Sequence, residues 1–496
     1  MMQVLLMSLL PAILLVISNR LSRPKLKQAP QSLWIGDAVA LLSGSLITVV
    51  LIGFSQRVGC SIALVVLLVV LLFAGNRLKI ALLGETLVFS DIFLAGHAIC
   101  YPRLYFGYAP VWIWPTLLLA LLAWVFLFAY ETPLSLGMQE RILTVVGLVS
   151  VLMGFIVWIQ RKIQKDNHAW SLMFDAQKDA AAFTPLGAAL LHSLWHAEHR
   201  QNLKCLYCDS LAEAEVADKK ISTPMKKPHL MLIQAESFCD LAELTGRDSV
   251  MPTLDQLRTQ GVTGAFNLAW QGAYTMRSEF AVLTGVAPQS LQTYAFDPYQ
   301  MASAIAMPSL ARQLKAQGYK TVVWHPNDGR FFNRTQVMKN FGFDEFLDIA
   351  DFKDLPINGR YISDEALLTK AAEYLKNTQT PTFLFVITME AHGPWDAGKF
   401  PESEPLSENQ RYEKHLISLD RGLASLSRSI QNQDLNAELF LYGDHQPGLK
   451  SLREKRQPGS TSQTLWLALG QRFHPKRLDI EPQQLPNIIL TGMSHD

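Results

Sequence analysis

Four side chains in the second half of the chain have the chemistry to hold a divalent cation and attack a phosphorus atom. Glu236, Asp444 and His445 are hard or borderline metal ligands, and each ends an apolar run of the length of a strand. Thr275 lies between apolar segments, where a helix is expected to begin. A helix N-terminus favours anions, and a threonine hydroxyl becomes a nucleophile when a cation or base removes its proton. These residues therefore predict metal-assisted chemistry on a phosphate ester.

Each of the four residues has a simpler structural explanation when it is considered alone. An Asp–His pair after a strand commonly forms a turn or a cap. A threonine in front of a helix commonly caps that helix. The order and spacing of all four residues, and no single one of them, favour the catalytic interpretation.

The region from about residue 227 alternates short apolar runs with amphipathic helices. Residues 229–236, 382–390 and 437–445 are expected strands, 251–261 is an expected helix, and 309–325 is an expected helix followed by a strand. This alternation predicts a mostly parallel sheet covered by helices on both faces. Ligands of such sheets bind beyond the carboxyl ends of the strands, where the polar residues of this chain also gather.

The first third of the chain is far more apolar than the rest, and it explains why 49% of all residues are hydrophobic. A helix needs ~20 mostly apolar residues to cross a bilayer. Five segments meet this requirement: 2–19, 33–54, 59–75, 109–130 and 142–160. We therefore expect a multi-span α-helical membrane domain.

The side of the membrane on which the C-terminal domain lies depends on one further stretch. Residues 80–98 are apolar but contain Glu85 and Asp91, so they either cross the membrane or form an interfacial loop, and the loop is favoured. The basic loop after the first span is expected in the cytoplasm. Five spans then place the C-terminal domain inside and six place it outside, and the loop charges leave both arrangements open.

The sequence thus predicts three regions: a transmembrane domain over 1–160, linker helices over 161–224 and an α/β catalytic domain over 225–496. The net charge of +1 provides no basic excess for nucleic acid, so we expect no nucleic-acid partner. Five cysteines are too few for a disulfide framework. For the single C-x-x-C pair, Cys205 and Cys208, a local disulfide or two thiols is favoured over a metal site.

The motifs of the C-terminal domain resemble those of the lipoteichoic acid synthase and phosphoglycerol transferase group, within the alkaline phosphatase and sulfatase superfamily. The matching stretches follow in the order of that group: IQAESF (233–238), T-x-x-S-E-F from Thr275, HPNDGRFFNRTQVMKNFGFDEFLD (325–348), ITMEAHGPW (387–395) and LYGDH (441–445). The resemblance spans about residues 228–470, and the preceding multi-span region agrees with it. It implies an alkaline phosphatase-like α/β domain joined to a membrane domain.

The resemblance also implies a metal site and a nucleophile. Glu236, Thr275, Asp444 and His445 would surround one divalent cation, Mn²⁺ or Mg²⁺ in most members of the group, with Zn²⁺ as an alternative. Thr275 would be the catalytic nucleophile. Sulfate-ester hydrolysis is disfavoured, because sulfatases need a Cys or Ser in a C/S-x-P-x-R context that the residues following Thr275 do not supply.

A second set of residues is implied to bind the substrate. Arg334 and His392 would hold the phosphate and the headgroup, with His325 close by, and His392 would give a proton to the departing oxygen or bind a hydroxyl. Phe332 stands where synthases of the group often have tryptophan, and Asn327 matches an aspartate of the group. Both positions should contact the headgroup or the acceptor, so these two differences from the group leave the identity of the substrate open.

Arg334 and His392 also have structural alternatives. Arg334 could form a surface ion pair with Asp344 or Glu345, and His392 could be a strand-end histidine that the backbone satisfies. Within the ordered motif set the functional interpretation is favoured for both.

The resemblance implies transfer of glycerol phosphate from phosphatidylglycerol to an extracytoplasmic glycan or glycerophosphate polymer, through a phosphothreonine intermediate. The enzyme would be a multi-pass protein of the bacterial cytoplasmic membrane with its catalytic domain outside. One alternative is phosphoethanolamine transfer from phosphatidylethanolamine. Another is a non-catalytic membrane scaffold, which the presence of all four metal-site residues disfavours. The sequence predicts no oligomeric state.

Overall fold

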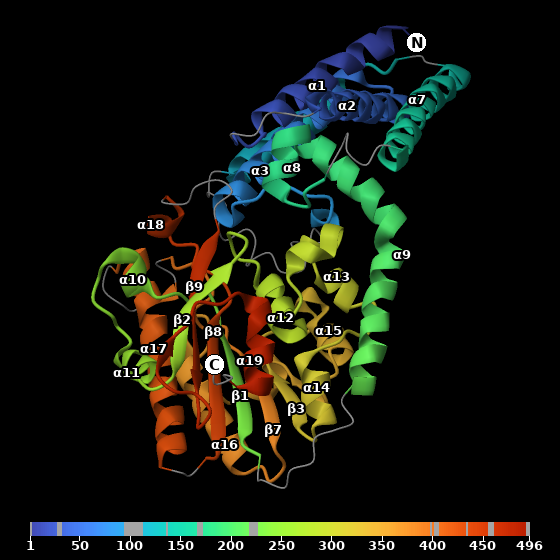
Figure 1. Ribbon diagram of the computed structural model, residues 1–496. Coiled ribbons are helices and arrows are strands. Elements are labelled where there is room, and N and C mark those ends of the chain that lie inside the picture. Colours follow the sequence, from blue (N-terminus) through green and yellow to red (C-terminus); the bar gives the residue numbers. More distant parts are fainter. Residues whose placement is uncertain are drawn as a thin grey trace. The chain divides into compact units, whose positions relative to one another are not determined.

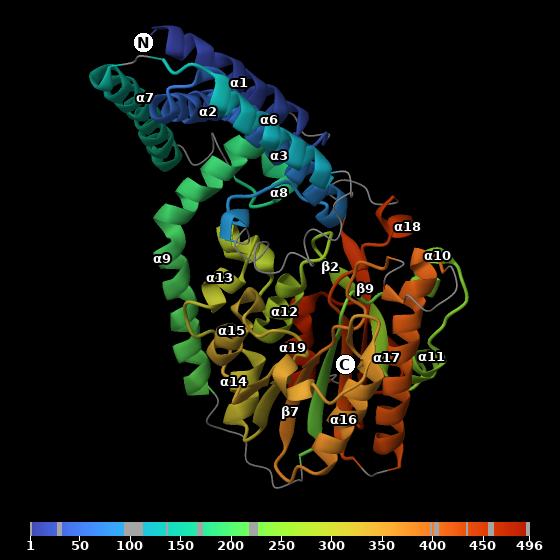
Figure 2. The same cartoon turned by 180° about the vertical axis from the view of Figure 1, so that it is seen from behind.

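The computed structural model describes residues 2–26, 32–93, 113–134, 137–165, 172–217, 227–396, 399–400, 406–432, 435–454 and 461–492. The chain folds as two compact units, residues 1–198 and 199–496 (Figures 1 and 2). The prediction for Cys205 and Cys208 concerns side chains outside the described ones.

The first unit is helical. Its elements are α1 (Met2–Leu21), α2 (Leu33–Ser55), α3 (Val58–Leu83), α6 (Ile113–Tyr130), α7 (Met138–Lys165), α8 (Ala176–Phe183) and α9 (Pro185–Ala217), the last of which continues into the second unit. Within the part of this unit that the structure describes, three helices are long and apolar enough to cross a membrane: Leu33–Ser55, Val58–Leu83 and Met138–Lys162. Apolar side chains such as Leu119 and Leu143 are each 66% exposed, as expected of helices that face lipid. The predicted helical membrane domain is confirmed.

Three of the five predicted spans correspond to described helices that are long and apolar enough to cross a membrane. The apolar parts of the first and fourth predicted spans, Leu5–Leu21 and Trp114–Tyr130, are shorter helices, and residues 109–112 lie outside the described ones. Of the stretch 80–98, the described part is not one crossing helix. α3 ends at Leu83, and residues 84–90 are not helical. Asp91 follows them and forms a 2.7 Å ion pair with Lys79, which satisfies its charge.

The second unit contains an eight-stranded sheet in the order β10-β2-β9-β8-β1-β7-β3-β4. Its strands are β1 (His229–Ala235), β2 (Val262–Leu268), β3 (Lys320–Trp324), β4 (Glu345–Leu347), β7 (Thr382–Ile387), β8 (Ala437–Gly443), β9 (Ser462–Leu469) and β10 (Lys476–Arg477). The five strands from β8 to β4 run parallel, and β9 is antiparallel to both neighbours. The predicted, mostly parallel sheet is confirmed.

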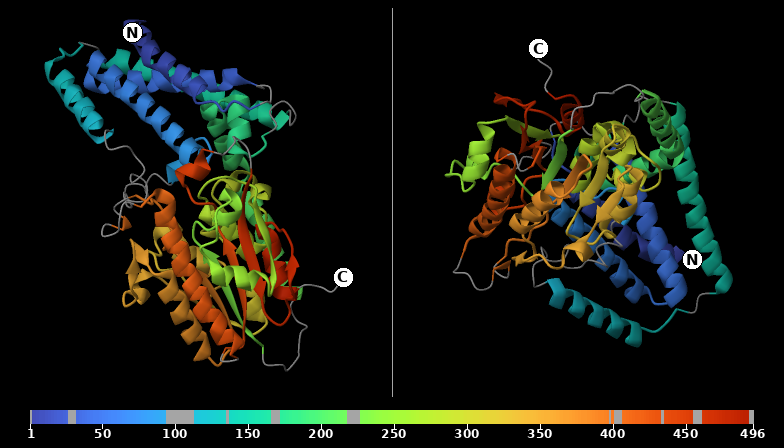
Figure 3. Two further views of the ribbon diagram at one scale, coloured as in Figure 1. Left: turned by 90° about the vertical axis from the view of Figure 1, so that its left-hand side faces the viewer. Right: turned by 90° about the horizontal axis from the view of Figure 1, so that it is seen from below.

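Helices cover both faces of this sheet. The helices and the small hairpin strands are α10 (Leu241–Thr245), α11 (Pro252–Arg258), α12 (Thr275–Thr284), α13 (Tyr299–Ala302), α14 (Leu310–Ala316), α15 (Arg334–Asn340), β5 (Ile357–Asn358), β6 (Tyr361–Ile362), α16 (Asp364–Lys376), α17 (Glu408–Gln431), α18 (Lys450–Arg453) and α19 (Leu485–Thr491). The orange helices α16 and α17 lie on one side of the sheet in the left view of Figure 3 and share a core with Met231 and Ile233 of β1. α12 packs with α14 and α19. β1 is buried on both faces, which is why its sequence is an apolar run without alternation.

The strand register brings four strand ends to one edge of the sheet. Ala235 at the end of β1 pairs with Gly443 at the end of β8, and Gln234 of β1 pairs with Ile387 at the end of β7. Trp324, the last residue of β3, pairs with Val386. Residues that directly follow these strands therefore meet at the carboxyl edge, where ligands of such sheets bind.

Candidate active site

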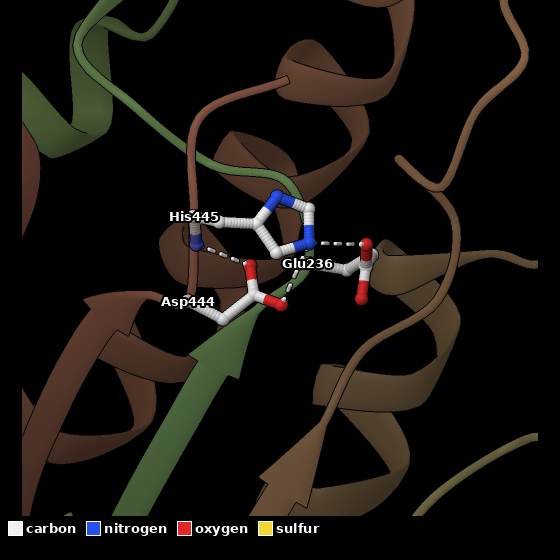
Figure 4. A group of neighbouring side chains, drawn as sticks. All are labelled: Glu236, Asp444 and His445. Carbon is white, nitrogen blue, oxygen red and sulfur yellow. Dashed lines mark hydrogen bonds and ion pairs between the residues drawn. The ribbon is translucent and has the colours of Figure 1, made fainter. Parts of the chain in front are cut away.

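Three predicted metal ligands meet at this edge. Glu236 directly follows β1, and Asp444 and His445 directly follow β8 (Figure 4). The Nε2 atom of His445 lies 3.4 Å from Oε1 of Glu236 and 3.3 Å from Oδ2 of Asp444. One ligand atom of each residue lies within 4.8 Å of the others, and all three side chains are buried.

Local hydrogen bonds fix the orientation of these ligands. The backbone N–H groups of Ser237 and His445 each donate to Oδ1 of Asp444 over 2.8 Å. The Ser237 hydroxyl donates to Oε1 of Glu236, also over 2.8 Å. Nδ1 of His445 lies 3.0 Å from the carbonyl oxygen of Gln446, so Nδ1 carries the proton in the neutral ring and Nε2 faces the carboxylates.

The charge balance of the cluster favours a cation. Burial raises the pKa of Asp444, the negative charge of Glu236 adds to this effect, and the pKa reaches about 7. Burial by itself would lower the pKa of His445, but the two carboxylates raise it to about 9. Burial opposes ionisation of Glu236, yet His445 and His392 lower its pKa to about 2. A cluster that raises the proton affinity of its histidine is one in which positive charge is stabilised.

The donor set also fits a divalent metal ion. Oδ2 of Asp444 is buried and accepts no hydrogen bond, and Nε2 of His445, itself a metal ligand by type, lies 3.3 Å from it. A buried carboxylate oxygen without a donor costs free energy unless a cation contacts it. Two carboxylates and one imidazole nitrogen make three protein ligands, which is the number that leaves a position open for a substrate at a catalytic site.

Thr275 occupies the start of α12, beside the cluster. The Ser278 hydroxyl donates to the Asp444 carbonyl oxygen, so α12 is attached to the end of β8. The Thr275 side chain is one of the groups that lower the pKa of Asp444, which agrees with its position beside that carboxylate. The N-cap position belongs to Tyr274, and no side-chain capping hydrogen bond is formed there. The simpler explanation that Thr275 only caps the helix therefore does not hold, and the residue is half-buried.

Arg334 does not form the surface ion pair that was its structural alternative. Asp344 and Glu345 pair with lysines, whereas the Arg334 side chain is only 3% exposed and pairs with Glu279. Its Nε and Nη2 atoms donate to the two carboxylate oxygens of Glu279 over 3.2 and 3.0 Å. Sequence reasoning missed Glu279, although the T-x-x-S-E-F motif contains it four residues after Thr275, on the same face of the helix.

His325 follows β3 and lies against Arg334. Its Nε2 atom is 3.0 Å from Nη1 of Arg334, and its Nδ1 atom is 3.4 Å from the carbonyl oxygen of Ile387. Burial and the charge of Arg334 hold the pKa of His325 well below its usual value. His325 is therefore neutral, and its Nε2 accepts a hydrogen bond from Arg334.

His392 lies on the loop after β7. Its Nδ1 atom is 2.8 Å from the carbonyl oxygen of Gly393 and 3.4 Å from the hydroxyl of Tyr361. Burial lowers the pKa of His392, and the charge of Glu236 only partly offsets this, so the ring is neutral near pH 7. Because a ring nitrogen that faces a carbonyl oxygen carries the proton, Nε2 is the nitrogen with an unshared electron pair. The backbone thus satisfies one nitrogen only.

Asn327 and Phe332 lie on the loop between β3 and α15, and both are half-buried. The Phe332 ring centroid is 5.6 Å from the guanidinium carbon of Arg334. Phe332 and Asn333 have φ values of 56° and 54°, in the left-handed region that non-glycine residues rarely adopt. Such backbone strain is typical of functional loops, and here it precedes Arg334 directly.

Lys399 is a second residue that the sequence did not reveal, and it supports the loop of His392. Its side chain is 1% exposed, and its Nζ atom donates to the carbonyl oxygens of Glu390 and His392. Burial, together with the nearby charge of Arg360, lowers the pKa of Lys399 to about 7. No local pattern in the sequence identifies a buried lysine, because its neighbours come from other elements.

The thermal stability of Lys399→Met should show a specific dependence on pH. Below about pH 7 the lysine is charged in both states, and the folded state bears the cost of burying that charge. Between about pH 7 and the ordinary lysine pKa of about 10.4, the unfolded chain binds a proton that the folded chain does not, so the free energy of unfolding rises with pH. This rise is absent from Lys399→Met.

We therefore expect the melting temperature of Lys399→Met, relative to that of the wild type, to be higher at about pH 6.5 than at about pH 9. Differential scanning calorimetry of the detergent-solubilised chain measures this difference. Lys376→Met, at an exposed lysine at the end of α16, is the control and should show no such trend. A pH-independent difference for Lys399→Met contradicts the assignment of a neutral buried lysine.

Comparison with known proteins places the cluster within a described family. Residues 228–474 match the family model described as Sulfatase. The capsular polysaccharide biosynthesis protein RkpI of Rhizobium meliloti is 28% identical over 398 residues, which cover 77% of this chain and 73% of that protein. The match to RkpI is longer than the sulfatase region and so includes part of the remaining chain.

Two further proteins are similar to part or all of this chain. A lipoteichoic acid synthase of Staphylococcus saprophyticus is 27% identical over 240 residues, which cover 44% of this chain and 36% of the synthase, so the chain matches about a third of its length. The integral membrane lipooligosaccharide phosphoethanolamine transferase A of Neisseria meningitidis has a TM-score of 0.58 at 12% identity and covers 98% of this chain and 94% of its own. This likeness shows that the two chains share a fold of membrane helices and an α/β domain.

Proposed function

Residues 228–474 of this chain form a sulfatase domain of the alkaline phosphatase superfamily, and from this premise we propose that the chain is a metal-dependent phosphoglycerol transferase. It transfers glycerol phosphate from phosphatidylglycerol to an extracytoplasmic glycan or glycerophosphate polymer. The observation that carries the proposal is the position of Thr275, the first residue of α12, because the Ser278 hydroxyl attaches this helix to Asp444 of the buried cluster of Glu236, Asp444 and His445.

Thr275 is the nucleophile in the first step. Its oxygen forms a bond to the phosphorus of phosphatidylglycerol, the bond from phosphorus to the diacylglycerol oxygen breaks, and a phosphothreonine results. The proton that leaves Thr275 is matched by the proton that diacylglycerol gains. The N–H groups at the start of α12 and the Arg334 guanidinium stabilise the negative charge of the phosphate group.

His392 acts in the second step. Its Nε2 atom accepts the proton of an acceptor hydroxyl as that oxygen forms a bond to phosphorus and the bond to Thr275 breaks. The Thr275 oxygen then regains a proton, which restores its hydroxyl and leaves His392 neutral. The neutral ring near pH 7 supports this role, because only an unprotonated nitrogen can accept the proton. The same nitrogen can hold a headgroup hydroxyl before transfer begins.

A divalent cation, Mn²⁺ or Mg²⁺ with Zn²⁺ as an alternative, supplies positive charge that polarises a phosphoryl oxygen and lowers the pKa of a bound hydroxyl. Glu236, Asp444, His445 and the hydroxyl of Thr275 are the residues that would hold it.

The membrane helices support a lipid donor. Three helices long enough to cross a bilayer, and the fold shared with an integral membrane protein, support a membrane-anchored chain. We place it in the bacterial cytoplasmic membrane, with residues 1–160 as the membrane domain, 161–224 as linker helices and 225–496 as a catalytic domain on the outer side. Outside the cytoplasm ATP is absent, and a phospholipid headgroup is then the available phosphate source.

The choice of phosphatidylglycerol rests on the loop between β3 and α15. An ammonium headgroup would call for a carboxylate, but the loop carboxylate, Asp328, is held by the guanidinium of Arg330, with Nη2 and Oδ2 2.7 Å apart. A glycerol headgroup needs hydrogen-bonding groups such as the Asn327 amide. The fold shared with a phosphoethanolamine transferase favours phosphatidylethanolamine as the second candidate donor.

Mass spectrometry of the product tests the proposal. The detergent-solubilised chain is incubated with Mn²⁺, an envelope glycan fraction and vesicles of either phospholipid, and the glycan is analysed. We expect glycerol phosphate on the glycan and diacylglycerol in the lipid fraction. A nitrogen-containing phosphoethanolamine adduct would move the assignment to the second donor. No adduct from either lipid would contradict transfer to such acceptors.

A further inference from the structure

The guanidinium of Arg334 is held by two residues that do not belong to the metal cluster. Glu279 accepts hydrogen bonds from Nε and Nη2, and His325 accepts one from Nη1. The side chains of Arg334 and Glu279 are 3% and 0% exposed, so this ion pair is removed from solvent. A bidentate pair of this kind fixes the plane of the guanidinium as well as its position.

Arg334 has N–H donors that Glu279 and His325 do not use. A guanidinium has five N–H donors, one on Nε and two on each terminal nitrogen. Three of the five are used by Glu279 and His325, which leaves one N–H group on Nη1 and one on Nη2. Two donors on neighbouring nitrogens suit two oxygens of one phosphate group.

Glu279 is itself held rigidly. The Tyr299 hydroxyl donates to Oε1 of Glu279, and the Gln234 amide donates to Oε2 over 3.2 Å. Gln234 belongs to β1, two residues before Glu236. The carboxylate that orients Arg334 is thus attached to the same strand that supplies a residue of the metal cluster.

The spacing along α12 connects this pair to the nucleophile. Glu279 follows Thr275 by four residues, so the two side chains lie on the same face of the helix, with their backbones ~6 Å apart along its axis. One helical turn therefore carries both the hydroxyl that attacks phosphorus and the carboxylate that orients the arginine.

We propose that Glu279 is a positioning residue, which together with His325 holds the Arg334 guanidinium so that its two remaining N–H groups receive the transferred phosphate group. This inference rests on the proposed function, because it concerns the same phosphate. It assigns His325 to the support of Arg334 rather than to direct contact with the headgroup. Thr275 and the Arg334 fork are then held at a fixed separation by α12.

A simple charge argument predicts the opposite effect of Glu279. A carboxylate close to a phosphate site repels an anion, so its removal should strengthen phosphate binding if Glu279 only neutralised a buried arginine. If Glu279 orients the fork, its removal should weaken binding, because two directed hydrogen bonds to phosphate are lost. The sign of the change therefore separates the two roles.

Isothermal titration of the full-length, detergent-solubilised chain with inorganic phosphate in the presence of Mn²⁺ makes this measurement. The variants are Glu279→Gln, Arg334→Ala and the double variant. We expect Glu279→Gln to weaken phosphate binding by about 10-fold to 100-fold, as is typical when a group that orients a ligand is lost. In the Arg334→Ala background the same change should have no further effect, because Glu279 acts only through Arg334.

Glu438→Gln is the matched control. Glu438 is a buried carboxylate that accepts hydrogen bonds from Nε and Nη2 of one arginine, Arg472, in the same arrangement. It lies six residues before Asp444 on β8, ~20 Å away along the strand. Its loss should reduce the melting temperature without changing phosphate affinity.

Several outcomes would overturn the inference. Unchanged or tighter phosphate binding by Glu279→Gln would do so, as would a loss that adds fully to that of Arg334→Ala, or no loss in Arg334→Ala itself. If Glu279→Gln does not fold, Glu279→Asp replaces it, since it keeps the charge but moves the carboxylate away by one methylene, and unchanged affinity would again overturn the idea. Absence of transfer from phosphatidylglycerol by the wild type, with these binding results intact, would contradict the proposed function alone.

Discussion

Thr275→Ala is expected to abolish the covalent intermediate and to lower the rate of headgroup transfer by about 10³-fold or more. An enzyme that loses its nucleophile loses the entire covalent route, and the remaining groups provide only binding and charge stabilisation. The alanine still fits the first turn of α12, because the N-cap position is Tyr274 and Thr275 contributes no capping bond there. The loss should therefore be one of chemistry rather than of folding.

Intact-mass analysis after incubation with phosphatidylglycerol and Mn²⁺ measures the intermediate, and release of labelled diacylglycerol measures the rate. Thr284→Ala is the control on the same helix. Its half-buried hydroxyl donates to the Phe280 carbonyl oxygen at the far end of α12, so the variant should retain both the adduct and the rate. A Thr275→Ala protein that transfers at the wild-type rate would exclude the phosphothreonine mechanism. An adduct on wild type alone supports both donor and nucleophile.

Asp444→Asn is expected to remove metal-dependent stabilisation and, with it, most of the transfer activity. Asp444 supplies the buried Oδ2 oxygen that no hydrogen bond satisfies, and its carboxylate also meets Thr275. A ligand that binds only the folded state stabilises it by about 2.7 kcal/mol at a hundredfold excess over its Kd. Wild type should gain this stabilisation from Mn²⁺ and lose it on chelation, whereas Asp444→Asn should respond to neither.

Thermal unfolding of the full-length chain with Mn²⁺ and with a chelator gives this comparison, and the transfer assay gives the activity. Asp420→Asn is the matched control. Asp420 is also a buried carboxylate that accepts two backbone N–H groups, those of Thr253 and Leu254, at the start of α11, but it lies on α17 outside the cluster. It should lose stability and keep its response to Mn²⁺. An equal response of wild type and Asp444→Asn would show that the cluster does not bind the ion.

The sequence alone determined the general architecture of this protein. Apolar runs of membrane length predicted a helical membrane domain, and short apolar runs alternating with amphipathic helices predicted a mostly parallel sheet covered by helices. Both predictions are confirmed. They succeeded because the environment of a segment, lipid or a core buried on both faces, leaves its mark on consecutive residues.

The sequence also identified which residues could do chemistry, since Glu236, Asp444 and His445 follow strands and Thr275 begins a helix. That they meet is a property of the tertiary structure. β1 lies between β7 and β8, and Ala235 at its end pairs with Gly443, which lies 208 positions later in the chain. Strand order is set by packing in three dimensions, and no local pattern records it.

The supporting groups of the site were decided by the tertiary structure alone. Glu279 was present in a recognised motif, but its partner Arg334 comes from another helix, 55 residues later. Lys399 was not singled out at all, because a lysine is normally a surface residue and only the surrounding elements bury this one. Local sequence specifies which segments form helices or strands and where they end. The partners of a buried charge come from segments distant in the chain, so only the packing of those segments shows which charges neutralise one another.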